Sequence, residues 1–202
     1  MLSYLHSDLD DYGVTKPVIY WQGKLAILTP TQNKKTKFGG PLPKAEVNEG
    51  ALLHSVFSIV TSEIPFLKNL QLESIPLIFP FRHDGGSIDY LIKSDGSICD
   101  IQVDPPSPEE NWPYAGYPLS FDEVSYECSA LEPISEDDRL RLLHQDPWFD
   151  KDRDIIVVVP SKYNDPSLPN NLWNVPEDEY CVQCVFVINT KTNIVNACTD
   201  VD

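Results

Sequence analysis

Residues 87–103 read SIDYLIKSDGSICDIQV and carry the clearest secondary-structure pattern of the chain. Apolar and polar side chains alternate on both sides of Asp95-Gly96, which is typical of strands that bury one face. Asp-Gly is a favoured two-residue turn because both of its positions tolerate positive φ. The stretch therefore predicts an antiparallel β-hairpin.

An apolar run over 75–81 precedes this hairpin, and the turn Arg82-His83-Asp84-Gly85-Gly86 separates the two. A turn between two strand patterns favours antiparallel neighbours, so we expect a three-stranded meander over 75–103. Pro76 and Pro80 lack the backbone N–H that a central strand donates to its neighbour. The first strand of the meander is therefore expected at a sheet edge or at a bulge.

Further strand patterns flank the meander in the sequence. A hairpin is predicted over 18–28, where two short β-branched or aromatic runs surround Gln22-Gly23-Lys24. Five consecutive branched apolar residues at 155–159 predict a strand that is buried on both faces. A terminal hairpin is predicted over 180–199, with its turn at 190–192.

Three segments carry helix signals. Apolar residues follow a 3.6-residue period over 49–70, and Ser120 and Glu123 have the spacing of a capping box, which predicts a short helix. Ser135, followed by three acidic residues, predicts a further helix start. Together the patterns predict a single α+β domain over residues 1–202, with a mainly antiparallel sheet of about six strands and three to four helices.

The 202 residues carry a formal net charge of −16, and this charge is unevenly distributed. Residues 104–154 hold 14 acidic and 4 basic side chains, a net charge of −10. Such a density repels phosphate backbones and anionic lipids, so neither nucleic acid nor a membrane is an expected partner. It would attract a basic protein, although the same charge also suits a solvated face that keeps the protein soluble.

The N-terminus and the cysteines predict where the protein is located. No apolar run approaches the ~20 residues of a membrane-spanning helix, and the first residues lack the basic and apolar regions of a secretion signal. The five cysteines are an odd number, which favours reduced thiols over a disulfide framework. We therefore expect a cytoplasmic protein.

The acidic stretch overlaps a proline-rich loop over 104–119 that contains several aromatic residues. Aromatic side chains supply large apolar contacts at protein interfaces, and acidic rims raise the association rate with a basic partner. The predicted partner-binding residues are Trp112, Tyr114, Tyr117, Asp122, Glu123, Glu136, Asp137 and Asp138.

No motif for catalysis, a metal or a cofactor stands out. Cys181-Val-Gln-Cys184 is a lone CxxC without the second pair that a zinc site needs, and the glycine pairs 39–40 and 85–86 lack the spacing of phosphate-binding loops. We therefore expect a protein that is not an enzyme and uses neither metal nor cofactor. The alternative is a small hydrolase with a centre at His83-Asp84 or at an unidentified pair of carboxylates.

Two segments resemble the SUKH superfamily. Residues 75–86 lead from a strand with a proline-aromatic step into an acidic-glycine turn, and a strand at 88–92 follows. Residues 117–124, which read YPLSFDEV, are similar to the start of the family's closing helix, whereas the family's N-terminal helix motifs are not found. Bacterial members are largely immunity proteins, so the resemblance implies an antitoxin that neutralises a protein toxin. A regulatory adaptor without a toxin partner is the alternative.

A second resemblance lies in Lys37-Phe38-Gly39-Gly40-Pro41-Leu42-Pro43, which is similar to the F-G-G-x-P motif of YwqG-like proteins. Those proteins have a longer, β-rich fold. They share no firmly established activity, so this resemblance implies a fold without implying a function.

Overall fold

A computed structural model describes residues 14–46, 52–83, 86–104, 106–108, 116–134, 154–160, 166–168, 172 and 182–201. Within these residues the chain forms eleven strands, one short 3₁₀ turn and no α-helix. The elements are β1 (Val18–Trp21), β2 (Lys24–Thr31), β3 (Lys37–Phe38), β4 (His54–Val60), η1 (Thr61–Glu63), β5 (Ser74–Phe79), β6 (Ser87–Ile92), β7 (Ile98–Asp104), β8 (Val124–Pro133), β9 (Asp154–Val159), β10 (Val182–Asn189) and β11 (Ile194–Val201).

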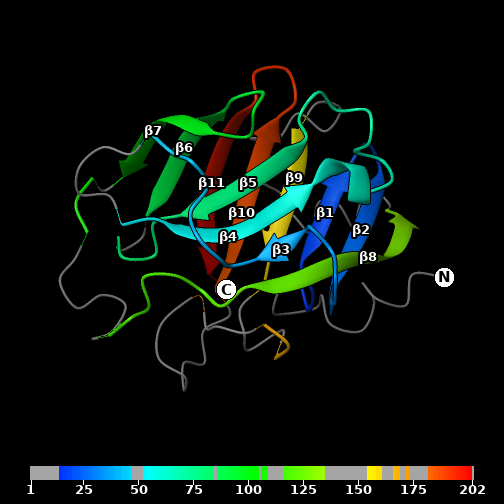
Figure 1. Cartoon of the computed structure of the whole chain (residues 1–202), viewed down its shortest axis with the longest axis horizontal. Coiled ribbons are helices and arrows are strands. Elements are labelled where there is room, and N and C mark those ends of the chain that lie inside the picture. The colour runs from blue at the N-terminus through cyan, green and yellow to red at the C-terminus, as the bar shows by residue number, and fades with distance from the viewer. Residues whose placement is uncertain are drawn as a thin grey trace.

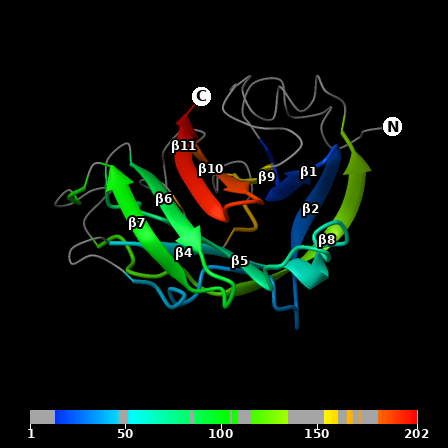
Figure 2. The same cartoon turned by 90° about the horizontal axis from the view of Figure 1, so that it is seen from above.

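The strands form one antiparallel sheet in the order β5-β4-β3-β8-β2-β1-β9-β10-β11-β6-β7. In Figure 1, β5, β4 and β3 cross in front of β11, β10 and β9, and β8 runs from this front layer to its partner β2. Seen from above in Figure 2, the sheet curls round on itself into a nearly closed barrel. The predicted α+β fold with about six strands and three to four helices is therefore wrong.

The core lies inside the curled sheet and contains buried side chains from nearly every strand. A second, smaller cluster lies on the opposite face of β1, β2, β9 and β10, so these central strands are buried on both faces. Every residue of β9 is buried, which confirms the prediction for 155–159. The hairpins predicted over 18–28 and 180–199 are confirmed as β1–β2 and β10–β11.

A tyrosine side chain connects the two ends of the sheet. β5 and β6 are not neighbours in the sheet, but the buried hydroxyl of Tyr90 on β6 reaches β5. It accepts a hydrogen bond from the Ile78 N–H (3.2 Å) and donates one to the Pro76 carbonyl (3.0 Å). Burial raises the pKa of Tyr90, so the phenol stays protonated and keeps both bonds.

The predicted meander is correct in one half only. β6 and β7 pair as a hairpin around Asp95-Gly96, as predicted, with a bulge between Asp89 and Leu91. β5 pairs with β4, whereas the meander placed it beside β6. β5 is the first strand in the sheet order and has one strand neighbour, which confirms the edge position that Pro76 and Pro80 predicted.

The helix predicted over 49–70 is wrong, because its centre is β4 and η1. Five of the seven β4 residues are buried and the other two are partly buried, so both faces of the strand are packed. The apolar spacing that suggested a helix is therefore that of a strand packed on two sides. Three of its residues, Val56, Ile59 and Val60, are β-branched and fit a pleated strand well.

The short helix predicted from Ser120 is also wrong, because residues 121–123 are irregular and β8 begins at Val124. Glu123 forms an ion pair with Lys37 of β3, so its side chain takes no part in a capping box. The helix predicted from Ser135 lies outside the described residues.

Candidate functional site

Two glycines allow β3 to continue between β4 and the segment before β8. The Gly39 N–H donates to the Val56 carbonyl and the Gly40 N–H donates to the Phe121 carbonyl, each at 3.0 Å. Both glycines have positive φ, and a Cβ on Gly39 would lie 2.3 Å from the Asp122 carbonyl oxygen. Only glycine fits at position 39, because the nearest atom is backbone and cannot move aside as a side chain could.

His54 fixes the same segment from the other side. Its Nε2 lies 2.7 Å from the Pro118 carbonyl oxygen, and its ring stacks on Phe121 with centroids 5.0 Å apart. Phe81 and Tyr117 meet the imidazole edge to face. Because a carbonyl oxygen only accepts, Nε2 carries the hydrogen in this bond.

The surroundings keep His54 neutral. Burial lowers the pKa of His54, and the positive charge of Arg82 lowers it further, against an opposing effect of the Pro118 carbonyl. A neutral imidazole among aromatic rings orients the chain without adding a buried charge. We call the group Gly39, Gly40, His54, Pro118 and Phe121 the junction.

Three exposed leucines lie around the junction. The exposed fractions are 41% for Leu42, 37% for Leu52 and 74% for Leu119. Leu42 is two residues from Gly40, Leu52 is two residues from His54, and Leu119 adjoins Pro118. An extended residue spans about 3.3 Å, so each leucine lies within roughly 7 Å of the junction along the chain. We call these three residues the leucine surface.

Carboxylates follow directly after the leucine surface. Asp122 and Glu123 are both exposed, immediately before β8. Glu123 forms an ion pair with Lys37, and its carboxylate lies over Gly40. The junction therefore presents exposed apolar side chains beside acidic ones on a backbone that hydrogen bonds and ring stacking hold in place.

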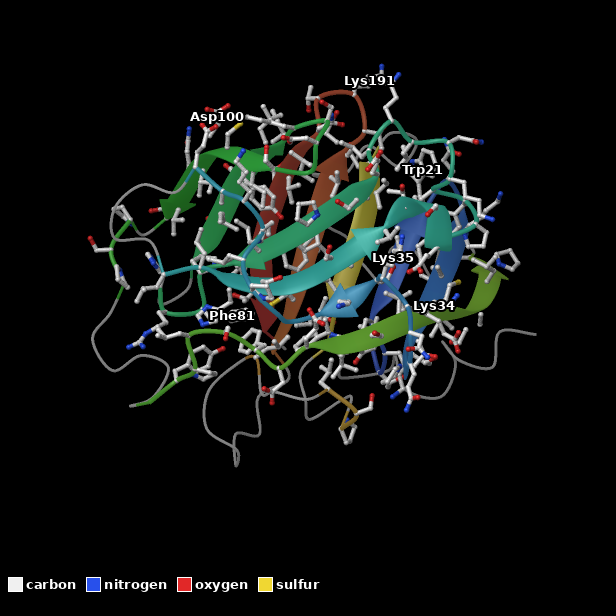
Figure 3. The ribbon with its side chains drawn as sticks, in the orientation of Figure 1. Trp21, Lys34, Lys35, Phe81, Asp100 and Lys191 are labelled. Carbon is white, nitrogen blue, oxygen red and sulfur yellow. The ribbon has the colours of Figure 1, made fainter. Side chains whose placement is uncertain are left out.

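The predicted partner-binding residues are only partly described. Asp122 and Glu123 are exposed, as such a role requires. Tyr117 is buried instead, and its hydroxyl donates to the Leu172 carbonyl at 2.7 Å, so it supports the junction from within. In Figure 3 the neighbouring Phe81 lies far from Trp21, at the other side of the molecule. The remaining residues, Trp112, Tyr114, Glu136, Asp137 and Asp138, lie outside the described part of the chain.

Sequence reasoning missed the leucine surface. Leu42 stands between Pro41 and Pro43, and Leu119 follows Pro118. A leucine next to proline fits poorly into a regular buried strand, and this was the available signal. The exposure itself depends on how β3, β4 and β8 meet, which local sequence does not specify.

The described residues contain no group of three or more His, Cys, Asp or Glu that could hold a metal ion. His83 is buried in a turn, and its predicted partner Asp84 lies outside the described residues. Cys184 is buried, and burial raises the pKa of its thiol, so it is not a reactive thiolate. Cys181 also lies outside the described residues.

Among the residues that the structure describes, no helix is long and apolar enough to cross a membrane. Comparison with family models, with curated proteins and with solved structures finds no match for this chain.

Proposed function

We propose that this chain is a non-catalytic binding protein that captures a basic protein partner through the leucine surface and the adjoining acidic residues. The observation that carries the proposal is the exposure of Leu119 on a fixed backbone segment, directly before Asp122 and Glu123. The partner class that we propose is a toxin, which the protein neutralises as an immunity protein would.

Apolar exposure supports a binding role. Exposed leucines close to one another are typical of a protein interaction site, whereas single exposed leucines are common on any surface. Leu42, Leu52 and Leu119 are each exposed and each lie within two residues of a junction residue along the chain. The contacts of His54 and the two glycines hold the segment before binding. Little conformational entropy is then lost when the partner docks, so more of the apolar contact energy contributes to affinity.

Charge supports a basic partner. Asp122 and Glu123 belong to the stretch 104–154, with its net charge of −10, and the whole chain carries −16. A field of this sign accelerates the approach of a basic protein and opposes anionic ligands. Because this effect acts at long range, it concerns the association rate more than the dissociation rate.

The test is rescue and binding with the product of a neighbouring toxin-domain gene. Co-expression of the chain should restore growth, and Leu119→Asp should abolish rescue by raising the dissociation rate about tenfold or more. Ile194→Asp is the matched control, because Ile194 is also exposed (40%) but lies on β11. It should leave rescue and kinetics unchanged.

The acidic residues are tested separately by their effect on association. Reversing Glu136, Asp137 and Asp138 to lysine should slow association and flatten its salt dependence, with little change in dissociation. If neither Leu119→Asp nor the triple reversal changed the binding rates, the proposal would be contradicted. Binding without rescue would favour a regulatory adaptor.

A further inference from the structure

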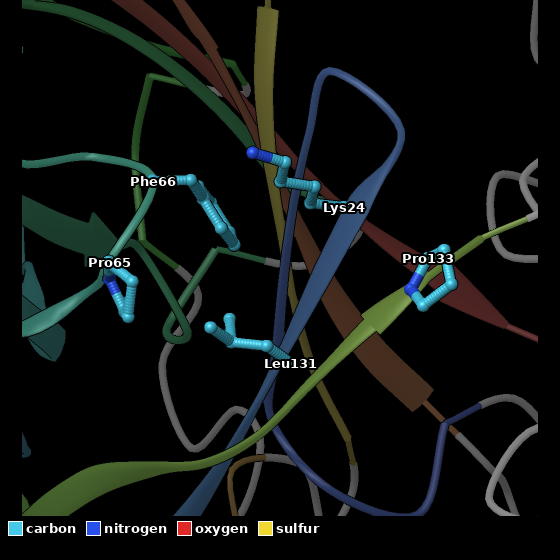
Figure 4. A pocket seen from close by; sticks show the side chains of 5 residues that line it. All are labelled: Lys24, Pro65, Phe66, Leu131 and Pro133. Carbon is cyan, nitrogen blue, oxygen red and sulfur yellow. The ribbon is translucent and has the colours of Figure 1, made fainter.

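A hollow of about 360 Å³ lies at the C-terminal end of β8, whereas the junction adjoins the N-terminal end of the same strand. Figure 4 shows the five side chains that line it: Lys24 from β2, Leu131 and Pro133 from β8, and Pro65 and Phe66 from the turn after β4. Four of these five are apolar. The hollow is independent of the proposed partner surface, because the two share no residue.

Strand register explains why the hollow faces the core. Lys24 pairs with Pro133 and Ala26 pairs with Leu131, and directly opposite residues share one face of a sheet. Ala26 belongs to the main core, so this is the inner face. The small Ala26 side chain fills little space opposite Leu131, which is itself 48% exposed. The inner face is therefore incompletely covered here.

The turn after β4 forms the opposite wall. Residues 61–70 make successive tight turns. The Ile64 N–H donates a hydrogen bond to the Thr61 carbonyl, and the Leu67 N–H donates one to the Ile64 carbonyl. Ile64 and Leu67 are buried, whereas Phe66 is half-buried and leaves one side of its ring toward the hollow. An aromatic ring, a leucine and two prolines thus give an apolar site.

Two hydrogen-bond donors lie on the same face. Among the described residues, Lys24 is the only charged one that lines the hollow, and it forms no ion pair with any of them. Trp21 is its partner across the β1–β2 hairpin, so the two side chains share a face. The Trp21 indole nitrogen is buried and has no acceptor among the described residues. Trp21 itself does not line the hollow, so Lys24 is the donor that a ligand there would meet.

We propose that this hollow binds a small apolar carboxylate, with a ring or short alkyl chain between Phe66 and Leu131 and the carboxylate at Lys24. The volume lies at the lower end of ligand sites, which excludes large cofactors and suits a single ring with a short tail. A carboxylate can accept hydrogen bonds from the Lys24 ammonium, and its negative charge complements the lysine.

The test measures binding of 3-phenylpropionate and its neutral amide by calorimetry and by ligand-observed NMR, on the full chain. 3-Phenylpropionate has roughly eleven non-hydrogen atoms, and a ligand of this size supports a dissociation constant on the order of 0.1–1 mM. The acid should bind about tenfold more tightly than the amide. Lys24→Gln should remove this preference and leave amide binding unchanged.

Variants at exposed positions keep the test independent of folding. Leu131→Asp should abolish binding of both ligands, and Ile194→Asp, at a similarly exposed residue of β11, should leave both unchanged. Lys191→Gln is the control for general charge, since Lys191 lies in the β10–β11 turn. Absence of saturable binding, or equal affinity for acid and amide, would overturn the proposal.

Discussion

The segments around the two ends of β8 pack in different ways. At the junction, Gly39 and Gly40 let three backbone segments approach closely, and His54 and Phe121 fill the remaining space with stacked rings. At the other end, the inner face stays partly open at the hollow, and nothing lies within 4 Å of a Cβ added to Gly23, which adjoins Lys24 in the β1–β2 turn. The filled end holds its exposed side chains on a fixed backbone, which suits a protein partner, whereas the open end offers a site for a small molecule.

Replacing one glycine near each end with alanine should give the largest difference in stability between the two ends. Gly39→Ala adds strain from positive φ and an overlap with the Asp122 carbonyl, so we expect a loss of roughly 2–5 kcal/mol in the free energy of unfolding. Gly23→Ala meets only the φ penalty, about 1–2 kcal/mol. Urea unfolding of both variants measures the difference.

The difference between the two variants is the informative quantity, because both residues have similar φ values of +69° and +73°. Equal losses at Gly39 and Gly23 would mean that the close approach to Asp122 contributes nothing. The junction would then lack the fixed backbone on which the leucine surface depends.

Acidification should reduce the stability that the junction contributes, through His54, without a matching effect at the hollow. Burial lowers the pKa of His54, so below about pH 6.5 the unfolded chain binds more protons than the folded one. Stability from His54 is complete above that pH and falls at lower pH, by up to about 1.4 kcal/mol per pH unit.

His54→Gln is the matched variant for this prediction, because it retains an Nε2–H donor for the Pro118 carbonyl but does not titrate. The difference in unfolding free energy between the parent chain and this variant should shrink or reverse as the pH falls from 7 to 5. Parallel pH profiles would show that His54 does not control the junction.

Some elements of the fold could be predicted from the sequence and others could not. The hairpins at 18–28, 87–103 and 180–199 follow from local alternation and turn residues, so their prediction succeeded. The strand at 155–159 was recognised by its apolar run. These signals are contained within one or two adjacent segments.

The helix predictions failed because their decisive contacts lie far away in sequence. The spacing within β4 fits a helix or a doubly buried strand equally well, and only its partners β3 and β5 decide between them. Glu123 has capping-box spacing but pairs with Lys37, 86 residues away. Pairing of β5 with β4, and the Tyr90 bonds that join it to β6, are likewise not encoded locally.

The candidate site was predicted only in part, because some of its features are local in sequence and others depend on distant strands. Charge is a local property, so the exposed Asp122 and Glu123 could be chosen from the sequence. Tyr117 was expected to be a surface anchor, yet its aromatic side chain packs on His54 and Phe121 inside the junction. The leucine surface and the hollow arise where distant strands meet, so neither had a reliable local signal.

The smallest expected effects on the unfolding free energy come from replacing one lysine near each end. Lys37 at the junction pairs with Glu123, but both side chains are more than a third exposed, so solvent screens the pair. Lys37→Met should therefore change the unfolding free energy by no more than about 0.5 kcal/mol. Lys24→Met at the hollow should cost no more than that, since Lys24 forms no ion pair with the described residues.

The two lysine variants should differ only when ligand is present. A ligand that binds only the folded chain raises the melting temperature, and the shift grows with the ratio of its concentration to the dissociation constant. At ~10 mM 3-phenylpropionate, the Lys37→Met chain should keep the shift of the parent chain, whereas Lys24→Met should lose most of it. Calorimetric melting curves measure this directly. If Lys24→Met instead lowered stability by more than about 1 kcal/mol without ligand, Lys24 would be part of the fold and the contrast between the two ends would fail.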